Sequence, residues 1–427
     1  MNNTFEIING RKYKKCKENQ IRNPKTNRCI NANIKDRIEY KKLLNKILNI
    51  DETNNCMRIY KYGADGKPIY IIGNNIILKK QIGIESDNGI IFLSSTKDNY
   101  NKIYKYAIKI VVENKENKKE IKLLKIVSDK VLKRECPHFP IIYSEIKCKD
   151  YLNIIKEDIK NYPKIIQKNK KKSFYYLLNE LAKGDLKTFL EKYHNDFNLL
   201  SNALGQIYIS LMFFYQETKH FHNDAHWGNF LYHKIKPGGY FHYNIFGKDY
   251  YIENYGFLWV IWDYGNAIEF KQSKKELIFV NKDFKNIINA FFNDNENVND
   301  YENKGWLSTK YIINSNFKLL IEKINKELFI DTVKELNFLH INKYNPNYIT
   351  KYTRKFNFYN ELPKEKYQTP EKYYNMITYS EKNMNNIIKF IIKILENNQI
   401  IKRIKKIQII NDKPYIINDK PYIIKKI

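Results

Sequence analysis

Two short polar segments, each following an apolar run, constrain this chain more than any other feature. Residues 222–229 read His-Asn-Asp-Ala-His-Trp-Gly-Asn, and residues 263–265 read Asp-Tyr-Gly. Asp224 and Asn229 therefore follow the pattern H-x-D-x-x-x-x-N, and Asp263 begins the pattern D-Y-G. A carboxylate can accept the proton of an attacking hydroxyl, and carboxylate and amide oxygens are ligands that Mg²⁺ accepts. The order and spacing of the two segments predict one site to which both contribute.

Upstream, residues 82–93 lie between two strand-like apolar runs, where such a site would need a glycine-rich phosphate-binding loop. Gly83 and Gly89 are present, and backbone N–H groups can approach a phosphate at Gly89. Glu85 replaces the middle glycine of G-x-G-x-x-G, and the loop is longer by one residue. The sequence of this segment fits a plain hairpin equally well, so its position along the chain is what predicts phosphate contact.

The next strand-like segment, residues 106–110, matches the V-A-I-K strand whose lysine contacts the α- and β-phosphates of a nucleotide. That lysine is Lys109, and its expected partner is a glutamate on the charged, helical stretch that follows. Glu113, Glu116 and Glu120 are the candidates. We favour Glu120 because the apolar residues after it give this helix a buried face, whereas a solvated pattern of alternating charge explains the other two.

Residues 176–186 read as the end of a buried strand that crosses into a hinge between two lobes. The G-x-L sequence at the end of this segment is expected to open a helix. The apolar run Leu204–Tyr215 predicts a long core helix that leads directly to His222. We expect His222 to support the polar loop and the D-Y-G turn, without taking part in proton transfer.

Taken together, these parts resemble a eukaryotic-type protein kinase, and the catalytic segment is similar to that of haspin kinases. The likeness is carried by His-Trp-Gly-Asn at 226–229, by Asp-Tyr at 263–264 and by the hairpin sequence at 242–248. It covers roughly residues 75–300. The resemblance implies an α+β, two-lobed protein-kinase-like fold with a small β-rich N-lobe and a larger helical C-lobe. It also implies ATP and Mg²⁺ as cofactors and a protein substrate phosphorylated on Ser or Thr.

The resemblance assigns a role to each candidate residue. Asp224 would be the catalytic base, and Asn229 and Asp263 would hold Mg²⁺. Lys109 would clamp the phosphates while Glu120 holds it in place. Contacts with the nucleotide are further implied at four positions: Gly83, Gly89, Glu180 and Leu181.

The chain also departs from the kinase pattern. Asn223 replaces the Arg of H-R-D, Gly265 replaces the haspin Thr, and no A-P-E sequence is found, so we expect a site assembled without an activating phosphorylation. His226 stands where most kinases have Lys, which leaves a small-molecule phosphotransferase of the same fold as an alternative. Glu85 in the phosphate loop favours a second alternative, a pseudokinase scaffold. The four retained motif residues argue against a scaffold.

The chain has 427 residues and is strongly basic, with 75 Lys and Arg against 46 Asp and Glu, a formal net charge of +29. Such a charge invites a nucleic-acid partner. Lys, Asn, Ile and Tyr dominate, however, as in proteins from AT-rich genomes, and the basic residues are spread along the chain. We therefore treat nucleic-acid binding as secondary and not as the main function.

Five cysteines, an odd number without close pairing, predict a reducing compartment. Cys16 and Cys29 belong to a basic module whose sequence at 23–30 resembles segments of proteins from giant cytoplasmic DNA viruses, so the expected location is the host cytoplasm or the virion. This pair fits a disulfide or half a zinc site, and the absence of nearby His disfavours metal. Residues 1–10 lack the apolar core of a signal peptide, and no apolar run approaches bilayer-spanning length, so no membrane partner is expected.

The sequence divides into four parts. Residues 1–65 read as a basic N-terminal extension with one helix at Lys35–Leu48, and residues 66–180 as the N-lobe. Residues 181–405 read as the C-lobe with a helical extension, and residues 406–427 as a tail.

Two features of the later parts leave alternatives open. Asp283, at the start of an apolar-patterned segment, reads either as a brace for the backbone of the catalytic loop or as a helix N-cap. In the tail, Asn411–Ile417 is repeated at once as Asn418–Ile424. A recent duplication is the favoured interpretation of this repeat, and docking of the tail is the lesser one.

Overall fold

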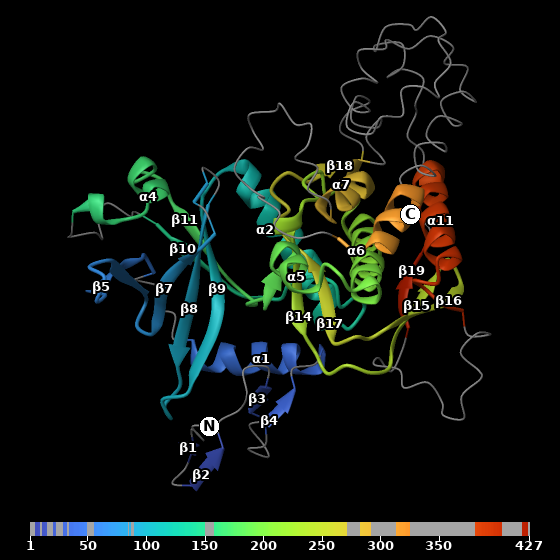
Figure 1. The fold of residues 1–427 in the computed structure, drawn as a ribbon. Coiled ribbons are helices and arrows are strands. Elements are labelled where there is room, and N and C mark those ends of the chain that lie inside the picture. The colour runs from blue at the N-terminus through green and yellow to red at the C-terminus, as the bar shows by residue number, and fades with distance from the viewer. Residues whose placement is uncertain are drawn as a thin grey trace, which may run out of the picture. The chain divides into compact units, whose positions relative to one another are not determined.

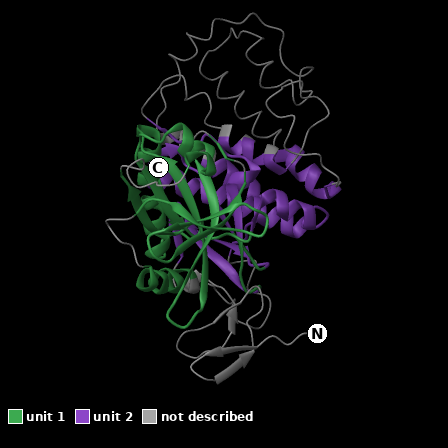
Figure 2. Ribbon diagram, turned by 90° about the vertical axis from the view of Figure 1, so that its left-hand side faces the viewer, with its two compact units in different colours: residues 1–183, 233–237, 256–258 green, residues 184–232, 238–255, 259–427 purple. Residues whose placement is uncertain are grey.

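The computed structural model shows an α+β protein (Figure 1). The structure describes the following residues: 5–8, 11–14, 20–22, 29–31, 34–48, 55–83, 85–86, 89–149, 158–270, 282–291, 313–324, 381–403 and 421–425. They divide into two compact units (Figure 2). The first unit comprises residues 1–183, 233–237 and 256–258, and the second comprises residues 184–232, 238–255 and 259–427. The predicted division at 180/181 lies near the first of these boundaries.

A seven-stranded antiparallel sheet forms the centre of the first unit, in the order β10-β11-β9-β8-β7-β6-β5. The strands are β5 (Arg58–Tyr62), β6 (Pro68–Ile72), β7 (Ile76–Ile82), β8 (Ile90–Lys97), β9 (Ile103–Val112), β10 (Ile142–Cys148) and β11 (Phe174–Asn179). Ile, Val, Tyr and Phe recur in these strands because β-branched and aromatic side chains pack well on a pleated surface. Every residue of β11 is buried, so this strand lies in the interior of the unit.

Among the described residues, four helical segments and two small hairpins complete the first unit. They are α1 (Ile34–Ile47), α2 (Lys115–Leu132), η1 (Ile159–Asn161) and α4 (Lys164–Lys168), with hairpins β1 (Phe5–Ile8)–β2 (Arg11–Lys14) and β3 (Gln20–Arg22)–β4 (Cys29–Asn31). Helix α1 confirms the helix predicted at Lys35–Leu48. Helix α2 begins where Asn114 accepts a hydrogen bond from the N–H of Asn117, and it buries the apolar face predicted after Glu120. Strand β5 lies within the predicted N-terminal extension, residues 1–65, and belongs to the sheet of the first unit.

The second unit is built around one long helix, α6. Its described elements are β12 (Gly184–Asp185), α5 (Leu186–Tyr193), α6 (Phe197–Thr218), β13 (His220–Phe221), η2 (Trp227–Asn229), β14 (Phe230–Lys234), β15 (Tyr240–Ile245), β16 (Lys248–Glu253), β17 (Phe257–Ile261), β18 (Ile268–Glu269), α7 (Lys282–Phe291), α11 (Glu381–Asn397) and β19 (Tyr422–Ile424). Strands β14 and β17 each have residues in both units. Helix α6 confirms the predicted core helix. Residues 315–324 and α11 are helical, as predicted for 310–405, and the rest of that range lies outside the described residues.

Helix α6 is also the one helix among the described residues that is long and apolar enough to cross a membrane. The expectation that no apolar run approaches this length is therefore wrong. Most of α6 is buried inside the protein, however, and a helix that is apolar on all sides is typical of a protein core.

The hairpin sequence at 242–248 that supported the haspin resemblance forms the β15–β16 hairpin, with Phe246 and Gly247 as the turn. Both turn residues have positive φ, 53° and 83°, which is the geometry of a two-residue turn between twisted strands. The tail strand β19 pairs in parallel with β15, and Figure 1 shows β19, in red, beside this hairpin. The tail is therefore docked, which was the lesser of the two interpretations of the repeat.

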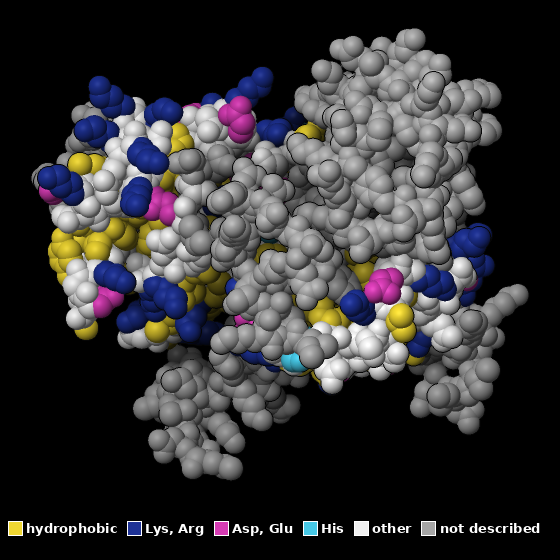
Figure 3. Space-filling model, turned by 45° about the horizontal axis from the view of Figure 1, so that its top comes forward, with side chains coloured by type: hydrophobic (Ala, Val, Ile, Leu, Met, Phe, Trp, Pro, Cys, Tyr) yellow, Lys and Arg dark blue, Asp and Glu magenta, His cyan; other side chains and the backbone are white. Residues whose placement is uncertain are grey.

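On the face drawn in Figure 3, Lys and Arg side chains lie in several groups over the described residues, with a few Asp and Glu side chains and apolar patches between them.

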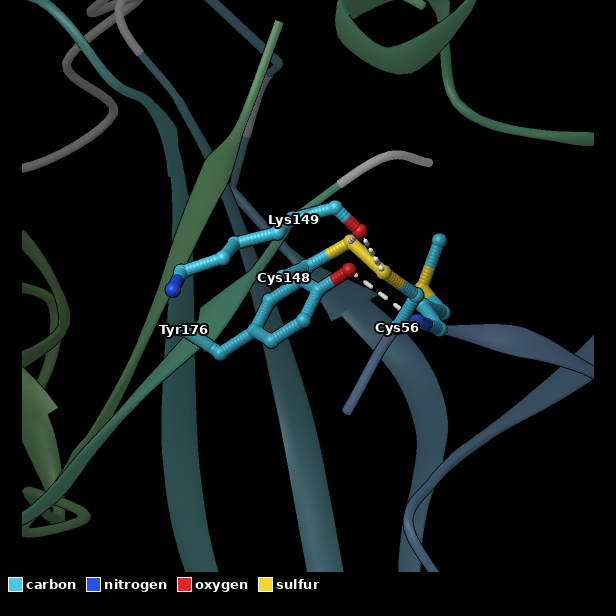
Figure 4. The surroundings of a disulfide bond; sticks show 5 residues. Cys56, Cys148, Lys149 and Tyr176 are labelled. Carbon is cyan, nitrogen blue, oxygen red and sulfur yellow. Dashed lines mark hydrogen bonds between the residues drawn. A yellow bond between two sulfur atoms is a disulfide. The ribbon is translucent and has the colours of Figure 1, made fainter. Parts of the chain in front are cut away.

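A disulfide in the first unit corrects the reading of the cysteines. Cys56 and Cys148 are 92 residues apart in sequence, and the structure joins them (Figure 4). Next to the disulfide, the hydroxyl of Tyr176 accepts a hydrogen bond from the N–H of Met57 at 3.0 Å. The reducing compartment was predicted from an odd number of cysteines without close pairing in the sequence, and that argument did not anticipate a pair 92 residues apart. Cys16 lies outside the described residues.

Candidate functional site

Asp283, in the first turn of α7, fixes the backbone of the loop that carries Asp224. One of its carboxylate oxygens accepts from the N–H of His222 and the other from the N–H of Asn223, both at 2.8 Å. The hydroxyl of Tyr215 on α6 donates to the same carboxylate at 2.9 Å. Burial raises the pKa of Asp283, and these hydrogen bonds oppose that rise. The structure thus confirms the first of the two readings of Asp283, a brace for the loop backbone.

His222 joins the two polar segments. Its Nε2 lies 2.9 Å from the carbonyl oxygen of Trp262, the residue immediately before Asp263. Because a carbonyl only accepts, Nε2 is the donor in this contact. Nδ1 is buried and has no hydrogen-bond partner among the described residues. The ring is therefore held as a support for the turn, as expected, and its Nδ1 is closed off from solvent.

A second bond ties the same segments together from the other end. The N–H of Trp262 donates to the carbonyl oxygen of Asn229 at 2.8 Å. Asp263 and Asn223 both have positive φ, 63° and 62°, which is uncommon outside glycine and most often seen for Asn and Asp. Such backbone costs of the order of 1–3 kcal/mol and persists where surrounding contacts enforce it, a pattern found at functional sites. The two segments thus form one rigid constellation within the second unit.

Asp224 is held in one orientation but stays reachable. Its Oδ2 accepts from the side-chain amides of Asn229 at 3.3 Å and Asn266 at 3.2 Å. The Asp224 side chain is 33% exposed, so a hydroxyl group could reach its other oxygen. His226 lies farther away, with its Nε2 at 3.9 Å from Oδ2, and its Nδ1 accepts from the N–H of Gly228. His226 therefore shapes the loop backbone more than it pairs with Asp224.

Asn229 and Asp263 carry oxygens that suit Mg²⁺. The amide nitrogen of Asn229 donates to both the backbone and the carboxylate of Asp224, which leaves its Oδ1 as the atom that can bind a cation. Asp263 adds a carboxylate, one oxygen of which accepts weakly from the N–H of Gly265 at 3.4 Å. No group of three or more His, Cys, Asp or Glu lies together among the described residues. Mg²⁺ keeps several waters and takes one or two carboxylates plus phosphate oxygens, so this small oxygen set still fits it.

In the first unit, Lys109 on β9 and Glu120 on α2 form the ion pair that the sequence predicted. Lys109 Nζ lies 2.5 Å from Glu120 Oε1, and both side chains are buried. Of the other two candidates, Glu113 pairs with Lys118 and Lys147, whose hydrogen bonds lower its pKa to about 2.

The glycine-rich segment is described except for residues 84, 87 and 88. Gly89 lies against β9: a Cβ there would come within 2.9 Å of the Ile110 carbonyl and 3.6 Å of the Lys109 side chain, so this position requires glycine. Its N–H donates to Ser86 Oγ at 3.2 Å, which closes the loop on itself. Gly83 has φ +71° and open space around it. Glu85 accepts a hydrogen bond from the N–H of Ile165 at 2.5 Å, so its charge is engaged by α4.

The predicted hinge residues Glu180 and Leu181 follow β11 directly. The N–H of Glu180 donates to the Ile141 carbonyl at 2.9 Å, so it is already used within the unit. Leu181 is half-buried. The Glu180 side chain forms a buried ion pair with Arg37 of α1, at 2.6 and 2.7 Å.

Sequence reasoning missed this buried cluster entirely. Arg37 also donates to the carbonyls of Pro137 and Phe139, at 2.7 and 2.6 Å. His233 lies 3.6 Å from Glu180. Burial lowers the pKa of His233 to about 4 despite the nearby carboxylate. Burial would raise the pKa of Glu180, but the charges of Arg37 and His233 together with hydrogen bonds hold it below its ordinary value.

A scan against protein-family models found no match, and a search of curated proteins found no related protein.

Proposed function

We propose that this chain is a protein kinase that transfers the γ-phosphate of ATP to Ser or Thr hydroxyls of a protein substrate. The observation that carries the proposal is the network in the second unit that locks the two polar segments to each other. Asp283 holds the backbone at His222, and His222 in turn holds the carbonyl of Trp262. A brace of this kind fixes Asp224, Asn229 and Asp263 before any ligand binds, as phosphoryl transfer by positioning requires.

Each residue then has a defined task. Asp224, oriented by two amides, accepts the proton of the attacking hydroxyl. Asn229 Oδ1 and the Asp263 carboxylate hold Mg²⁺, which when bound offsets the charge of the phosphates. Lys109 contacts the phosphates from β9, and its buried pairing with Glu120 keeps the ammonium group in one place.

The order of elements in the first unit also supports the proposal. The glycine-rich segment lies between β7 and β8, and Lys109 lies on the next strand, β9. Helix α2 follows directly and carries Glu120. This is the arrangement expected of a kinase small lobe, in which the lysine on the third strand pairs with a glutamate on the following helix.

The decisive experiment is phosphate transfer from radiolabelled ATP with the full chain expressed in bacteria. A protein lysate is compared with a panel of sugars and aminoglycosides, and the Asp224→Asn variant serves as the control. We expect label on protein Ser and Thr, and a loss of at least about 100-fold in the variant, the usual contribution of a general base. Label on the small molecules alone would replace the proposal with a small-molecule phosphotransferase.

A pseudokinase scaffold was suggested by the acidic residue in the phosphate loop. The observed bond between Glu85 and the N–H of Ile165 weakens that suggestion, because the carboxylate is engaged by the protein. A scaffold would show no turnover in any arm of the assay, whether or not Mg·ATP shifts its melting temperature. That outcome would refute the kinase proposal.

A further inference from the structure

The C-terminal strand β19 is held on the second unit by the edge of β15 and by Gln216, together termed the groove. It extends the β16–β15 hairpin to three strands by pairing in parallel with β15. The N–H of Phe246 donates to the carbonyl of Ile424 at 2.9 Å, which continues the ladder past the end of β15. Tyr422 and Ile424 are buried, whereas Ile423 between them is 48% exposed. The strand is therefore docked through two alternate side chains.

The groove contacts the docked strand in two ways: it forms hydrogen bonds with the backbone, and it packs against the buried side chains. Gln216 of α6 bonds the backbone on both sides: its Nε2 donates to the Ile423 carbonyl at 3.3 Å, and its Oε1 accepts from the N–H of Lys425. These bonds hold any strand equally well. Selectivity comes from the two buried side chains, Tyr422 and Ile424, and the ring centroid of Tyr422 lies 5.8 Å from that of Tyr243. A fitting peptide thus needs an aromatic residue and, two positions later, a branched aliphatic residue.

The chain contains this peptide twice. Residues 411–417 and 418–424 have the same sequence, Asn-Asp-Lys-Pro-Tyr-Ile-Ile, and each copy is preceded by Ile-Ile. After the docked copy, Lys425 contributes its backbone N–H to Gln216, and Asn418 holds an equivalent N–H after the first copy. The first copy therefore brings every group that the second copy uses in the groove.

Both copies can also reach the groove. Lys402 exchanges two backbone hydrogen bonds, at 2.9 and 3.0 Å, with Tyr251 on the edge of β16 that faces away from β15. Three strand spacings, about 15 Å, separate Lys402 from β19. The chain from Lys402 to Tyr415 can span about 40 Å when extended, and the chain to Tyr422 more. Length thus allows either copy to dock in the same molecule.

We propose that the groove formed by β15 and Gln216 is a peptide-binding site for Pro-Tyr-Ile-Ile, and that the two tail copies are alternative ligands of it within one molecule. A groove with two equivalent ligands on one tether stays filled when either one leaves. The copy that is not docked keeps the same binding sequence.

The test uses the full chain and the hydrogen exchange of the Phe246 amide, which is protected by the docked strand. Three variants are compared with the native chain: Tyr422→Ala with Ile424→Asp, Tyr415→Ala with Ile417→Asp, and all four changes together. We expect each two-residue variant to lower the protection about two-fold, because the docked population is shared between two ligands. The four-residue variant should lose the protection that depends on docking.

Two further measurements make the outcome decisive. A synthetic peptide of sequence NDKPYIIN should restore Phe246 protection in the four-residue variant, whereas a peptide of the same composition in scrambled order should not. The proposal fails if changing Tyr422 and Ile424 alone removes as much protection as all four changes, because the groove would then accept only the second copy. It also fails if the protection left in that variant depends on protein concentration, since the ligand would then come from a second molecule.

Discussion

Replacing Arg37 by methionine should destabilise the first unit strongly, because it leaves the buried carboxylate of Glu180 without its ion-pair partner. Arg37 and Glu180 have side chains that are 5% and 6% exposed, and two charged hydrogen bonds join them. In the variant, Glu180 keeps the N–H of Ile141 at 3.2 Å and the ring of His233 at 3.6 Å. In the native chain burial lowers the pKa of His233 to about 4, and burial still opposes a charge on this ring in the variant, so it offers little compensation at pH 7.

The expected loss follows from these contacts. Removing one partner of a buried ion pair typically costs about 3–5 kcal/mol. The variant also loses the hydrogen bonds from the Arg37 guanidinium to the carbonyls of Pro137 and Phe139, and each lost bond costs about 1 kcal/mol. Methionine fills part of the volume and recovers some apolar contact. We therefore expect the free energy of unfolding to fall by about 4 kcal/mol at pH 7.

The measurement is urea unfolding at pH 7, with Lys41→Met as a matched control. Lys41 lies on the same helix, loses the same charge and donates one hydrogen bond, at 2.6 Å, to the carbonyl of Ile142. It is half-buried and forms no ion pair with a buried carboxylate in the part of the chain that the structure describes, so its loss should stay at about 1 kcal/mol. A double variant, Arg37→Met with Glu180→Leu, should recover most of the loss because no buried charge remains.

The effect should also depend on pH. In the native chain the pKa of Glu180 lies below its ordinary value, whereas in Arg37→Met burial alone would raise it. The variant can then protonate Glu180 at a higher pH than the native chain, so the difference between the two should shrink as the pH falls. The reasoning is refuted if Arg37→Met costs no more than Lys41→Met, or if the double variant is the least stable of all.

The other predictions concern the site and the same buried cluster. Asp263→Asn should abolish Mg²⁺-dependent turnover while the far-UV spectrum stays native, since an amide lacks the charge that offsets Mg²⁺; near-native phosphorylation would remove Asp263 from the metal site. Lys109→Met and Glu120→Gln should each impair ATP use, and the double variant should be little worse than either alone because the two act as one buried pair; additive losses in kcat/KM would contradict this. The His233 ring takes up a proton near pH 6.5 in the unfolded chain but only near pH 4 in the folded chain. Its contribution to the free energy of unfolding is therefore full above pH 6.5 and is lost as the pH falls to about 4, by up to about 3 kcal/mol. His233→Gln should make the urea midpoint depend less on pH over that range, and an unchanged pH dependence would count against the assignment. Because Asn223 offers no charge to a loop phosphate, phosphatase-treated protein from bacteria should phosphorylate substrate without a lag; turnover that appears only after preincubation with ATP would show that a phosphorylation elsewhere is needed.

The local chemistry of the site was readable from the sequence because neighbours in the chain encode it. The spacing of Asp224 and Asn229 within one loop brings the Asn amide onto the Asp carboxylate. Glu120 was chosen over Glu113 from the apolar face of its helix, and the structure forms that ion pair. The reason is that helix and strand periodicity decides which side chains share a buried face, and periodicity is a property of the sequence itself.

The choice between equal readings needed the fold. Asp283 fitted a cap or a brace, and only the meeting of α7 with the loop at His222 made it a brace. The sequence alone placed the negative charge of Glu85 in the phosphate loop, and only the structure showed that its carboxylate accepts from the N–H of Ile165 on α4. In both cases the partner is a backbone group, and backbone groups leave no trace in the residue pattern.

By itself, then, the sequence determined the strand and helix types, the polar segments with their order, and the repeat in the tail. Only the tertiary structure decided that Arg37 meets Glu180, that Cys56 meets Cys148, and that the second tail copy docks on β15. These partners are far apart in the chain, and no local pattern selects one basic residue among 75 or one cysteine among 5. The cost of desolvation decides which partners meet, because a charge or a strand edge is buried only where folding brings a partner to it.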